Sequence, residues 1–209
     1  AAYRSSEAQL LDRGGAPLQS LRVDMKVRRL PWVPLADISP AVQQAVLLAE
    51  DQRFMRHGGV DVSALATAAW DNLFSKKPRG ASTITMQLAG QLDADLQASS
   101  GGRSLRQKWD QMRAAQAIED SWSKAQIFEA YLNLVSFRGE LQGIASASYS
   151  LFGKAPSGLN QTDGIILASL VRAPNAPPAT VTRRACALAK EWRMDSSCQL
   201  IGQRVQTAL

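Results

Sequence analysis

Helix start and stop signals recur along this chain from residue 39 to its end, and they leave room for strands only near its beginning. Ser39-Pro40 supplies a cap and a first-turn proline, so we expect the helix that they open to run to Glu50. Caps, apolar faces and glycine or proline stops predict further helices that begin near Asp61, Ser82, Leu105, Ser123, Leu141, Thr162, Arg183 and Gln199. The pattern therefore predicts a mainly α fold.

Residues 8–33 are the only part of the chain with a strand-like pattern. Leu10-Leu11, a turn through Gly14-Gly15 and the stretch Leu18–Val23 together predict a β-hairpin. No internal repeat or low-complexity linker divides the sequence. We therefore expect a single domain over residues 1–209, in which 8–33 form a hairpin and extended entry and 39–209 form a helical body.

Composition describes a folded protein with an anionic partner. A hydrophobic content of 45% and a charged content of 20% over 209 residues are typical of a globular chain. The net charge of +6 favours binding to phosphate, to nucleic acid or to an anionic membrane surface. The basic residues are not interleaved with a nucleic-acid motif, so we expect no nucleic-acid partner.

The ends of the chain bear on its cellular compartment. No run of eighteen apolar residues is present, so this chain is not expected to span a membrane. There is no initiating Met or signal-like apolar region, and Ala1 looks like a cut made after a removed anchor or signal. Cys186 and Cys198 predict a disulfide outside the cytoplasm and two free thiols inside it.

Two adjacent carboxylates end the first predicted helix. Neighbouring side chains on a helix point about 100° apart, so Glu50 and Asp51 cannot both face one reacting atom. One of them is expected to act as an acid or base and the other to support it. A pair of solvated charges at a helix end is the alternative that the pair alone would favour.

A stretch of small residues and hydroxyls opens a later helix. In Gly80-Ala81-Ser82-Thr83-Ile84-Thr85-Met86-Gln87, hydroxyls and free backbone N–H groups at the helix start can hold phosphate or sugar oxygens. An ordinary helix cap is the structural alternative, and Ser82 can serve as both. A carboxylate and a phosphate cradle together would suit activation of a hydroxyl beside a phosphorylated donor.

The order of these motifs carries a family resemblance. E-D-x-x-F-x-x-H-x-G at Glu50–Gly59, followed by G-x-S-T-I-T, resembles the peptidoglycan glycosyltransferases, the lysozyme-like domain of class A penicillin-binding proteins. The resemblance runs from about Leu10 to about Pro178. Met86, the phrase Leu134–Gly143 and the two-cysteine tail are similar to the penicillin-binding protein 1C branch. It implies a mainly α, lysozyme-like fold with a short N-terminal β-hairpin.

The resemblance also implies roles for individual residues. Glu50 corresponds to the general base that takes the proton from the acceptor sugar, and Asp51 is its neighbour in the site. For Phe54 we expect packing behind the loop, and for His57 a structural role is the alternative to substrate contact. The positions that the resemblance assigns to substrate binding are Phe54, His57, Ser82, Thr83, Gln87, Arg103, Lys108 and Gln111.

The activity that the resemblance implies is polymerisation of lipid II into glycan strands, with release of undecaprenyl pyrophosphate, at the periplasmic face of the cytoplasmic membrane. Expected partners are the nascent glycan strand, the membrane surface, and a transpeptidase domain or other wall synthases. The family often uses a divalent cation, Mg²⁺ or Mn²⁺, on the pyrophosphate. No His/Asp/Glu cluster has ligand spacing in the sequence, so we expect no metal held by protein ligands.

Several positions depart from the family pattern. The family usually has Glu, Arg, Lys and Gln at four positions where this chain has Gln111, Gln107, Gly90 and Met86. We expect Arg106 or Arg138 to compensate in part for these changes. Losing several charged hydrogen bonds, each worth roughly 1.5–3 kcal/mol, would weaken turnover. A weakly active lipid II-binding scaffold is therefore one alternative function, and a lysozyme-like wall hydrolase is another.

One apolar helix face beside basic residues predicts membrane contact. Trp70, Leu73 and Phe74 share this face, and Lys76, Lys77 and Arg79 follow it directly. That arrangement is typical of an interfacial helix on an anionic membrane. A buried core face is the alternative.

Overall fold

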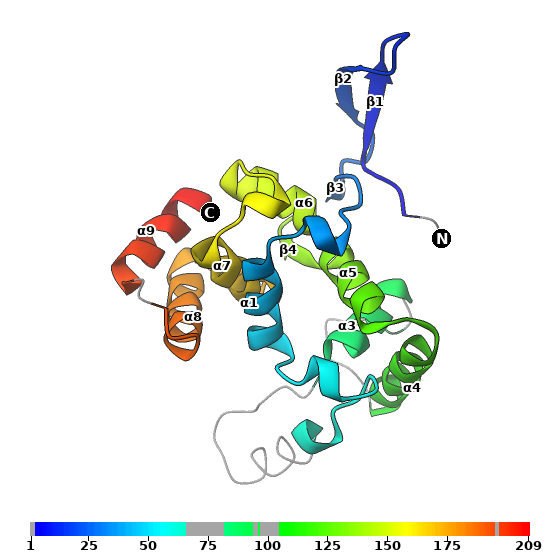
Figure 1. Cartoon of the computed structure of the whole chain (residues 1–209), viewed down its shortest axis with the longest axis vertical. Helices are drawn as coiled ribbons and strands as arrows, with labels where there is room; N and C mark the ends of the chain where they lie inside the picture. The colour runs from blue at the N-terminus through cyan, green and yellow to red at the C-terminus, as the bar shows by residue number, and fades with distance from the viewer. Residues whose placement is uncertain (1–2, 66–81, 94–95, 97–104, 195–196) are drawn as a thin grey trace. The chain divides into compact units, whose positions relative to one another are not determined.

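The structure is a computed structural model that describes residues 3–65, 82–93, 96, 105–194 and 197–209 (Figure 1). The chain divides into two compact units, one made of Ala1–Ala49 with Leu132–Leu209 and the other of Glu50–Tyr131. The single domain that we expected over 1–209 stays a prediction, because compactness alone does not define a domain.

The first unit contains the strands and most of the C-terminal helices. Its elements are β1 (Glu7–Leu11), β2 (Pro17–Arg22), β3 (Arg28–Arg29), the 3-10 helix η1 (Leu35–Asp37), most of α1 (Pro40–Glu50), β4 (Ser136–Arg138), β5 (Leu141–Gln142), α6 (Ile144–Ala147), the π-helix η4 (Ser148–Phe152), η5 (Pro156–Gly158), α7 (Gln161–Val171), α8 (Pro178–Glu191) and α9 (Cys198–Ala208). The second unit contains η2 (Phe54–Arg56), α3 (Ile84–Leu92), α4 (Leu105–Ser121) and most of α5 (Lys124–Leu134). The predicted mainly α fold is confirmed.

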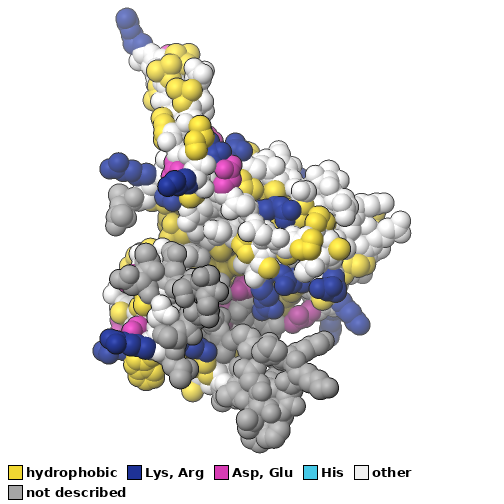
Figure 2. Space-filling view, turned by 180° about the vertical axis from the view of Figure 1, so that it is seen from behind, with side chains coloured by type: hydrophobic (Ala, Val, Ile, Leu, Met, Phe, Trp, Pro, Cys, Tyr) yellow, Lys and Arg dark blue, Asp and Glu magenta, His cyan; other side chains and the backbone are white. Residues whose placement is uncertain are grey.

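The predicted N-terminal hairpin is confirmed as well. Strands β1 and β2 pair antiparallel with Glu7 opposite Arg22, and the register shifts between Leu10 and Leu11. The hairpin stands out from the helices of its unit in Figure 1, and Figure 2 shows hydrophobic side chains on its surface. Leu10 and Leu18 in these strands have 55% and 65% of their surface exposed. The hairpin therefore adds little to the core.

The prediction that everything after Ser39 is helical is wrong at one place. β5 pairs in parallel with β3 and antiparallel with β4, so residues 141–142 are strand instead of helix. The following helix begins after Gly143, whose φ of 82° is left-handed. A Cβ there would lie 2.5 Å from the carbonyl oxygen of Asn133, so only glycine fits. The predicted stop at Gly153 is confirmed, with φ of 63°.

Helix α7 is the centre of the first unit and contacts α8 and α9. Its residues from Asp163 to Val171 are all buried, so this helix is part of the core. Asn160 and Asp163 form a capping box at its start. Asp163 is completely buried, and Lys154 and Arg204 supply its positive partners at 2.5 and 3.0 Å.

The second unit is built on the contact of α3 with α4. Thr83, one residue later than the predicted Ser82, is the cap of α3, and its hydroxyl oxygen accepts from the amide of Met86 at 3.1 Å. The predicted capping box of α5 is confirmed, because Ser123 N–H donates to Gln126 and Gln126 N–H donates to Ser123.

A disulfide joins Cys186 in α8 to Cys198 at the start of α9, as we expected for a protein outside the cytoplasm. Within the described part of the chain, every helix is too short or too polar to cross a bilayer.

Candidate active site

Glu50 is the last residue of α1, and its side chain is half-buried. The amide nitrogen Nε2 of Gln87 in α3 donates a hydrogen bond to Glu50 Oε2 at 2.9 Å. The hydroxyl of Tyr131 in α5 donates to Gln87 Oε1, also at 2.9 Å. Tyr131 thus holds the amide of Gln87, and this amide holds the Glu50 carboxylate that we expect to act as a base. Gln87, assigned to substrate binding from the sequence, uses both ends of its amide within the protein.

Asp51 follows the last residue of α1 and has different partners from Glu50. Its two carboxylate oxygens lie 2.9 and 3.0 Å from Nε2 of His57, so this nitrogen carries the hydrogen. Its Oδ2 also accepts from the amide of Ile84, the first residue of α3, at 3.1 Å. Asp51 is buried, with 8% of its surface exposed. It therefore supports the site by tying the motif loop to the start of α3.

The loop that carries Phe54 and His57 is clamped by Lys124. The Lys124 Nζ donates to the carbonyl of His57 at 2.6 Å, pairs with Glu119 at 2.7 Å and lies 4.4 Å from the centre of the Phe54 ring. Thr85 of α3 donates its hydroxyl to the same Glu119 oxygen at 2.6 Å. Phe54 is buried, which agrees with packing behind the loop and leaves no surface for a ligand.

Gly59 explains why the loop ends in a glycine pair. Its φ is +84°, and a Cβ there would lie 2.8 Å from the carbonyl oxygen of Ala115 in α4. A larger residue would therefore push α4 away from the loop. The carbonyl of Gly59 accepts the Thr83 hydroxyl at 2.5 Å, so the loop also contacts the start of α3.

The predicted phosphate cradle is largely filled by the protein itself. Thr83 is buried, and its hydroxyl both donates to Gly59 and caps α3. The carboxylate of Asp51 accepts a hydrogen bond from the backbone amide of Ile84, the first residue of α3. Ser82 precedes the cap and is half-buried, so it is the hydroxyl in this stretch that stays a candidate for substrate contact.

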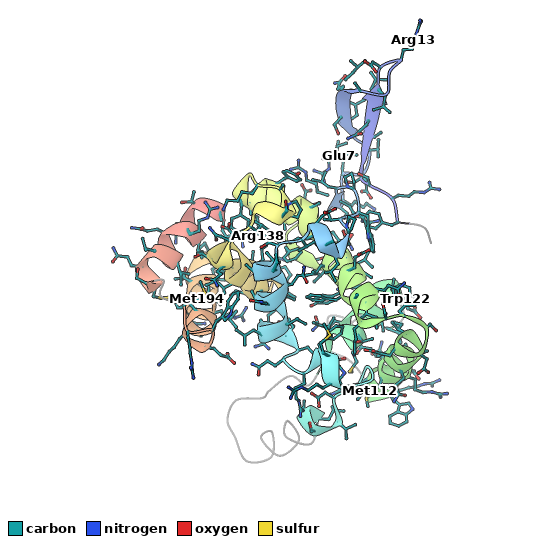
Figure 3. All side chains as sticks on the ribbon, viewed as in Figure 1. Glu7, Arg13, Met112, Trp122, Arg138 and Met194 are labelled. Atoms are coloured by element: carbon teal, nitrogen blue, oxygen red, sulfur yellow. A yellow bond between two sulfur atoms is a disulfide. The ribbon has the colours of Figure 1, made fainter. Side chains whose placement is uncertain are left out.

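The basic motif is described only in part. Arg103 lies outside the described residues, and Lys108 is half-buried on α4. Arg106, a candidate to compensate for Gln107, is exposed and lies 4.0 Å from Asp110. Arg138, labelled in Figure 3, donates to the backbone carbonyl of Ala176 at 3.1 Å within the first unit.

Gln111 does not occupy a place where a substrate could touch it. It has no exposed surface, and its Nε2 donates to the carbonyl of Met86 in α3 at 2.6 Å. The next residue on α4, Met112, is labelled in Figure 3. The assignment of Gln111 to substrate binding therefore does not hold in this structure, because its side chain packs inward onto α3.

Comparison with known proteins identifies the family of this chain. A family model described as Transglycosylase matches residues 15–194, which is most of the chain. This chain belongs to the transglycosylase family. The family resemblance seen in the sequence is confirmed.

Similar proteins share the match over much of this transglycosylase chain. Penicillin-binding protein 1C of Escherichia coli K12 is 38% identical over 162 residues, which are 77% of this chain and 20% of that protein. Biosynthetic peptidoglycan transglycosylases of Mannheimia succiniciproducens and Salmonella agona are each 35% identical, over 80% and 84% of this chain and 66% and 71% of theirs. The chain thus spans about a fifth of the first relative and about two thirds of the second.

One side-chain cluster of this transglycosylase was not predicted from the sequence. Ligand-type atoms of Asp51, His57 and Asp61 all lie within 4.8 Å of one another. Asp61 is bound by Arg53 at 2.6 and 2.9 Å and by the amide of Ala64 at 2.9 Å. Burial raises the pKa of Asp61, but these bonds and that from Ser63 outweigh burial and hold the pKa below its ordinary value. The cluster is thus already paired internally.

The family resemblance also matches Glu119 and residues 124–133 to helical landmarks that hold the architecture, but their individual contacts are known only from the structure. Tyr131 on α5 is fully buried. A buried tyrosine hydroxyl needs a partner, and this was the available signal. The predicted membrane face at Trp70, Leu73 and Phe74 lies outside the described residues.

Proposed function

We propose that this transglycosylase polymerises lipid II into peptidoglycan glycan strands and releases undecaprenyl pyrophosphate. The observation that carries the proposal is Glu50, a half-buried carboxylate at a helix end that an amide orients from the neighbouring helix. A general base needs a carboxylate that a neighbouring donor holds in one orientation, as Gln87 holds Glu50. The names of the similar transglycosylases support biosynthesis over hydrolysis.

In the proposed reaction, Glu50 takes the proton from the C4 hydroxyl of the acceptor GlcNAc. That oxygen forms a bond to C1 of the donor MurNAc, and the bond from C1 to the pyrophosphate oxygen breaks. Undecaprenyl pyrophosphate leaves with the electron pair, and the configuration at C1 inverts from α to β. Lys108 and Arg103 are proposed to stabilise the leaving pyrophosphate, whose negative charge grows in the transition state.

We place this reaction at the periplasmic face of the cytoplasmic membrane, where the lipid tail of the substrate stays in the bilayer. The nascent glycan strand is the proposed second substrate, and a transpeptidase domain or other wall synthases are proposed partners. A divalent cation, Mg²⁺ or Mn²⁺, would be carried by the substrate pyrophosphate and not by protein ligands. Chelation by EDTA should then lower turnover without lowering the melting temperature of the protein.

A lipid II-binding scaffold with weak turnover is the alternative, and the similar proteins, named as biosynthetic transglycosylases, do not favour it. A wall hydrolase is not favoured by any contact in the described site.

A gel assay with purified protein and lipid II tests the proposal. The wild type should form glycan chains, and Glu50→Gln should bind lipid II without forming them, because an amide cannot accept the proton. Glu191→Gln is the matched control, since Glu191 is also the last residue of a helix and is exposed. Binding without polymer in the wild type would favour the scaffold. Polymer formation by Glu50→Gln near the wild-type rate would refute the role of Glu50.

A further inference from the structure

The base is connected to a buried tyrosine through one glutamine. Gln87 Nε2 donates to Glu50 Oε2 and Gln87 Oε1 accepts from the Tyr131 hydroxyl, both at 2.9 Å. The three residues come from α1, α3 and α5, and all three belong to the second unit. Nothing in the family motifs used above assigned a part to Tyr131.

The chemistry of the amide makes the direction of this connection important. An ionised carboxylate only accepts hydrogen bonds, so the amide of Gln87 must present its NH₂ end to Glu50. The opposite orientation would bring the amide oxygen against the carboxylate, which repels it. A tyrosine hydroxyl that donates to Oε1 favours the productive orientation, because it satisfies the oxygen on the side away from Glu50.

Burial makes the effect of Tyr131 strong. Tyr131 is completely buried, so its hydroxyl cannot exchange Gln87 for bulk water without opening the helix packing. Its helix is fixed at the N-terminal end by the capping box of Ser123 and Gln126. The hydroxyl is therefore a fixed donor on a rigid element, as a group that orients a base requires.

We propose that Tyr131 is a positioning residue for the general base, acting on Glu50 through the amide of Gln87. This inference rests on the proposed function of Glu50. Tyr131 touches neither substrate nor the reacting atoms in this proposal. It keeps the Gln87 NH₂ group facing Glu50, so that Glu50 Oε2 is bound and the carboxylate stays in one orientation.

The test is a double-mutant cycle with Tyr131→Phe and Gln87→Met, read as kcat and KM for lipid II. Tyr131→Phe removes only the hydroxyl and should lower kcat about 3- to 10-fold, with KM within about 2-fold of wild type. Gln87→Met keeps the length of the side chain and should lower kcat at least as much. In the Gln87→Met background, adding Tyr131→Phe should change kcat by less than about 2-fold, since the connection is already broken.

Ile127→Val is the packing control, because Ile127 is fully buried one turn before Tyr131 on α5 and bonds to neither residue. It should lower the melting temperature and leave kcat within about 2-fold. Equal losses of kcat in Tyr131→Phe and Ile127→Val would overturn the proposal. It would also be overturned if Tyr131→Phe lowered kcat by the same factor in the Gln87→Met background as in the wild type. If Glu50→Gln stays active, the proposed role of Glu50 as the base is wrong. If Glu50→Gln is inactive while Tyr131→Phe keeps the wild-type kcat, only the positioning role of Tyr131 is wrong.

Discussion

The side-chain amide of Gln111 in α4 lies in the space that a side chain at Gly90 in α3 would need. A Cβ built at Gly90 would be 3.1 Å from Gln111 Nε2 and 3.4 Å from the carbonyl oxygen of Leu96. The same Nε2 donates to Met86, four residues before Gly90, at 2.6 Å. Two departures from the family pattern, at positions 90 and 111, are therefore one local arrangement of α3 against α4.

The effect of Gly90→Ala on stability should have opposite signs in the wild type and in a Gln111→Ala background. Alanine in place of glycine inside a helix is intrinsically stabilising by about 1 kcal/mol. In the wild type we expect Gly90→Ala to destabilise by about 1 kcal/mol, because Gln111 is pinned to Met86 and cannot yield without losing that bond. In the Gln111→Ala background, Gly90→Ala should instead stabilise. Urea unfolding of the four proteins checks this, and a stabilising Gly90→Ala in the wild type would contradict the coupling.

Lys124→Met should loosen the loop that carries His57. Methionine keeps most of the apolar stem but loses the bond to the His57 carbonyl and the ion pair with Glu119. Because the Glu119 side chain is 10% exposed, its charge would be left poorly compensated, and we expect a loss of about 1–3 kcal/mol in unfolding free energy. Adding Glu119→Gln should recover part of this loss. A double variant less stable than Lys124→Met would show that the ion pair is not the cause.

Asp61→Asn should make stability less sensitive to acid. The pKa of Asp61 is held below its ordinary value of 3.8 by its hydrogen bonds, which outweigh the opposing effect of burial. A carboxyl with a lowered folded pKa stabilises the fold above its unfolded pKa, and this stabilisation is lost as pH falls through the folded pKa. At pH 7 the unfolding free energy of the wild type should exceed that of the variant by about 1–3 kcal/mol, because asparagine cannot form the ion pair with Arg53. As the pH falls from the ordinary pKa of 3.8 through the lower pKa of the folded state, the two unfolding free energies should converge. A gap that stays constant with pH would contradict the linkage.

Reduction of the Cys186–Cys198 disulfide should lower stability without affecting the site. The bridge joins α8 to α9 across a sequence separation of 12 residues. Closing so short a loop contributes on the order of 3 kcal/mol at most. Free-thiol titration of the unfolded, unreduced protein should find no reactive thiol, and a reducing agent should lower the melting temperature. Two reactive thiols before reduction would rule the bridge out.

Local sequence signals predict several elements of this fold. Proline at the start of α1, the capping box at Ser123 and the glycine stop at Gly153 act within a few residues, so they can be read without the tertiary structure. The hairpin over residues 8–33 was predicted for the same reason. The short strand β5 was missed because it depends on pairing with Arg28 and Arg29, more than a hundred residues earlier in the chain.

The motifs in the sequence named the candidate base, Glu50, but they did not determine what its neighbours do. Which way an amide or hydroxyl points depends on groups brought from other helices, and periodicity carries no information about that. Only the tertiary structure placed Gln87 between Glu50 and Tyr131, turned Gln111 inward onto Met86, and set Asp51 against both His57 and the start of α3. The sequence determined the helices and the family, because these follow from local rules and motif order. Packing in the tertiary structure decided which polar side chains bond to one another, because each buried donor or acceptor needs a partner in the folded chain.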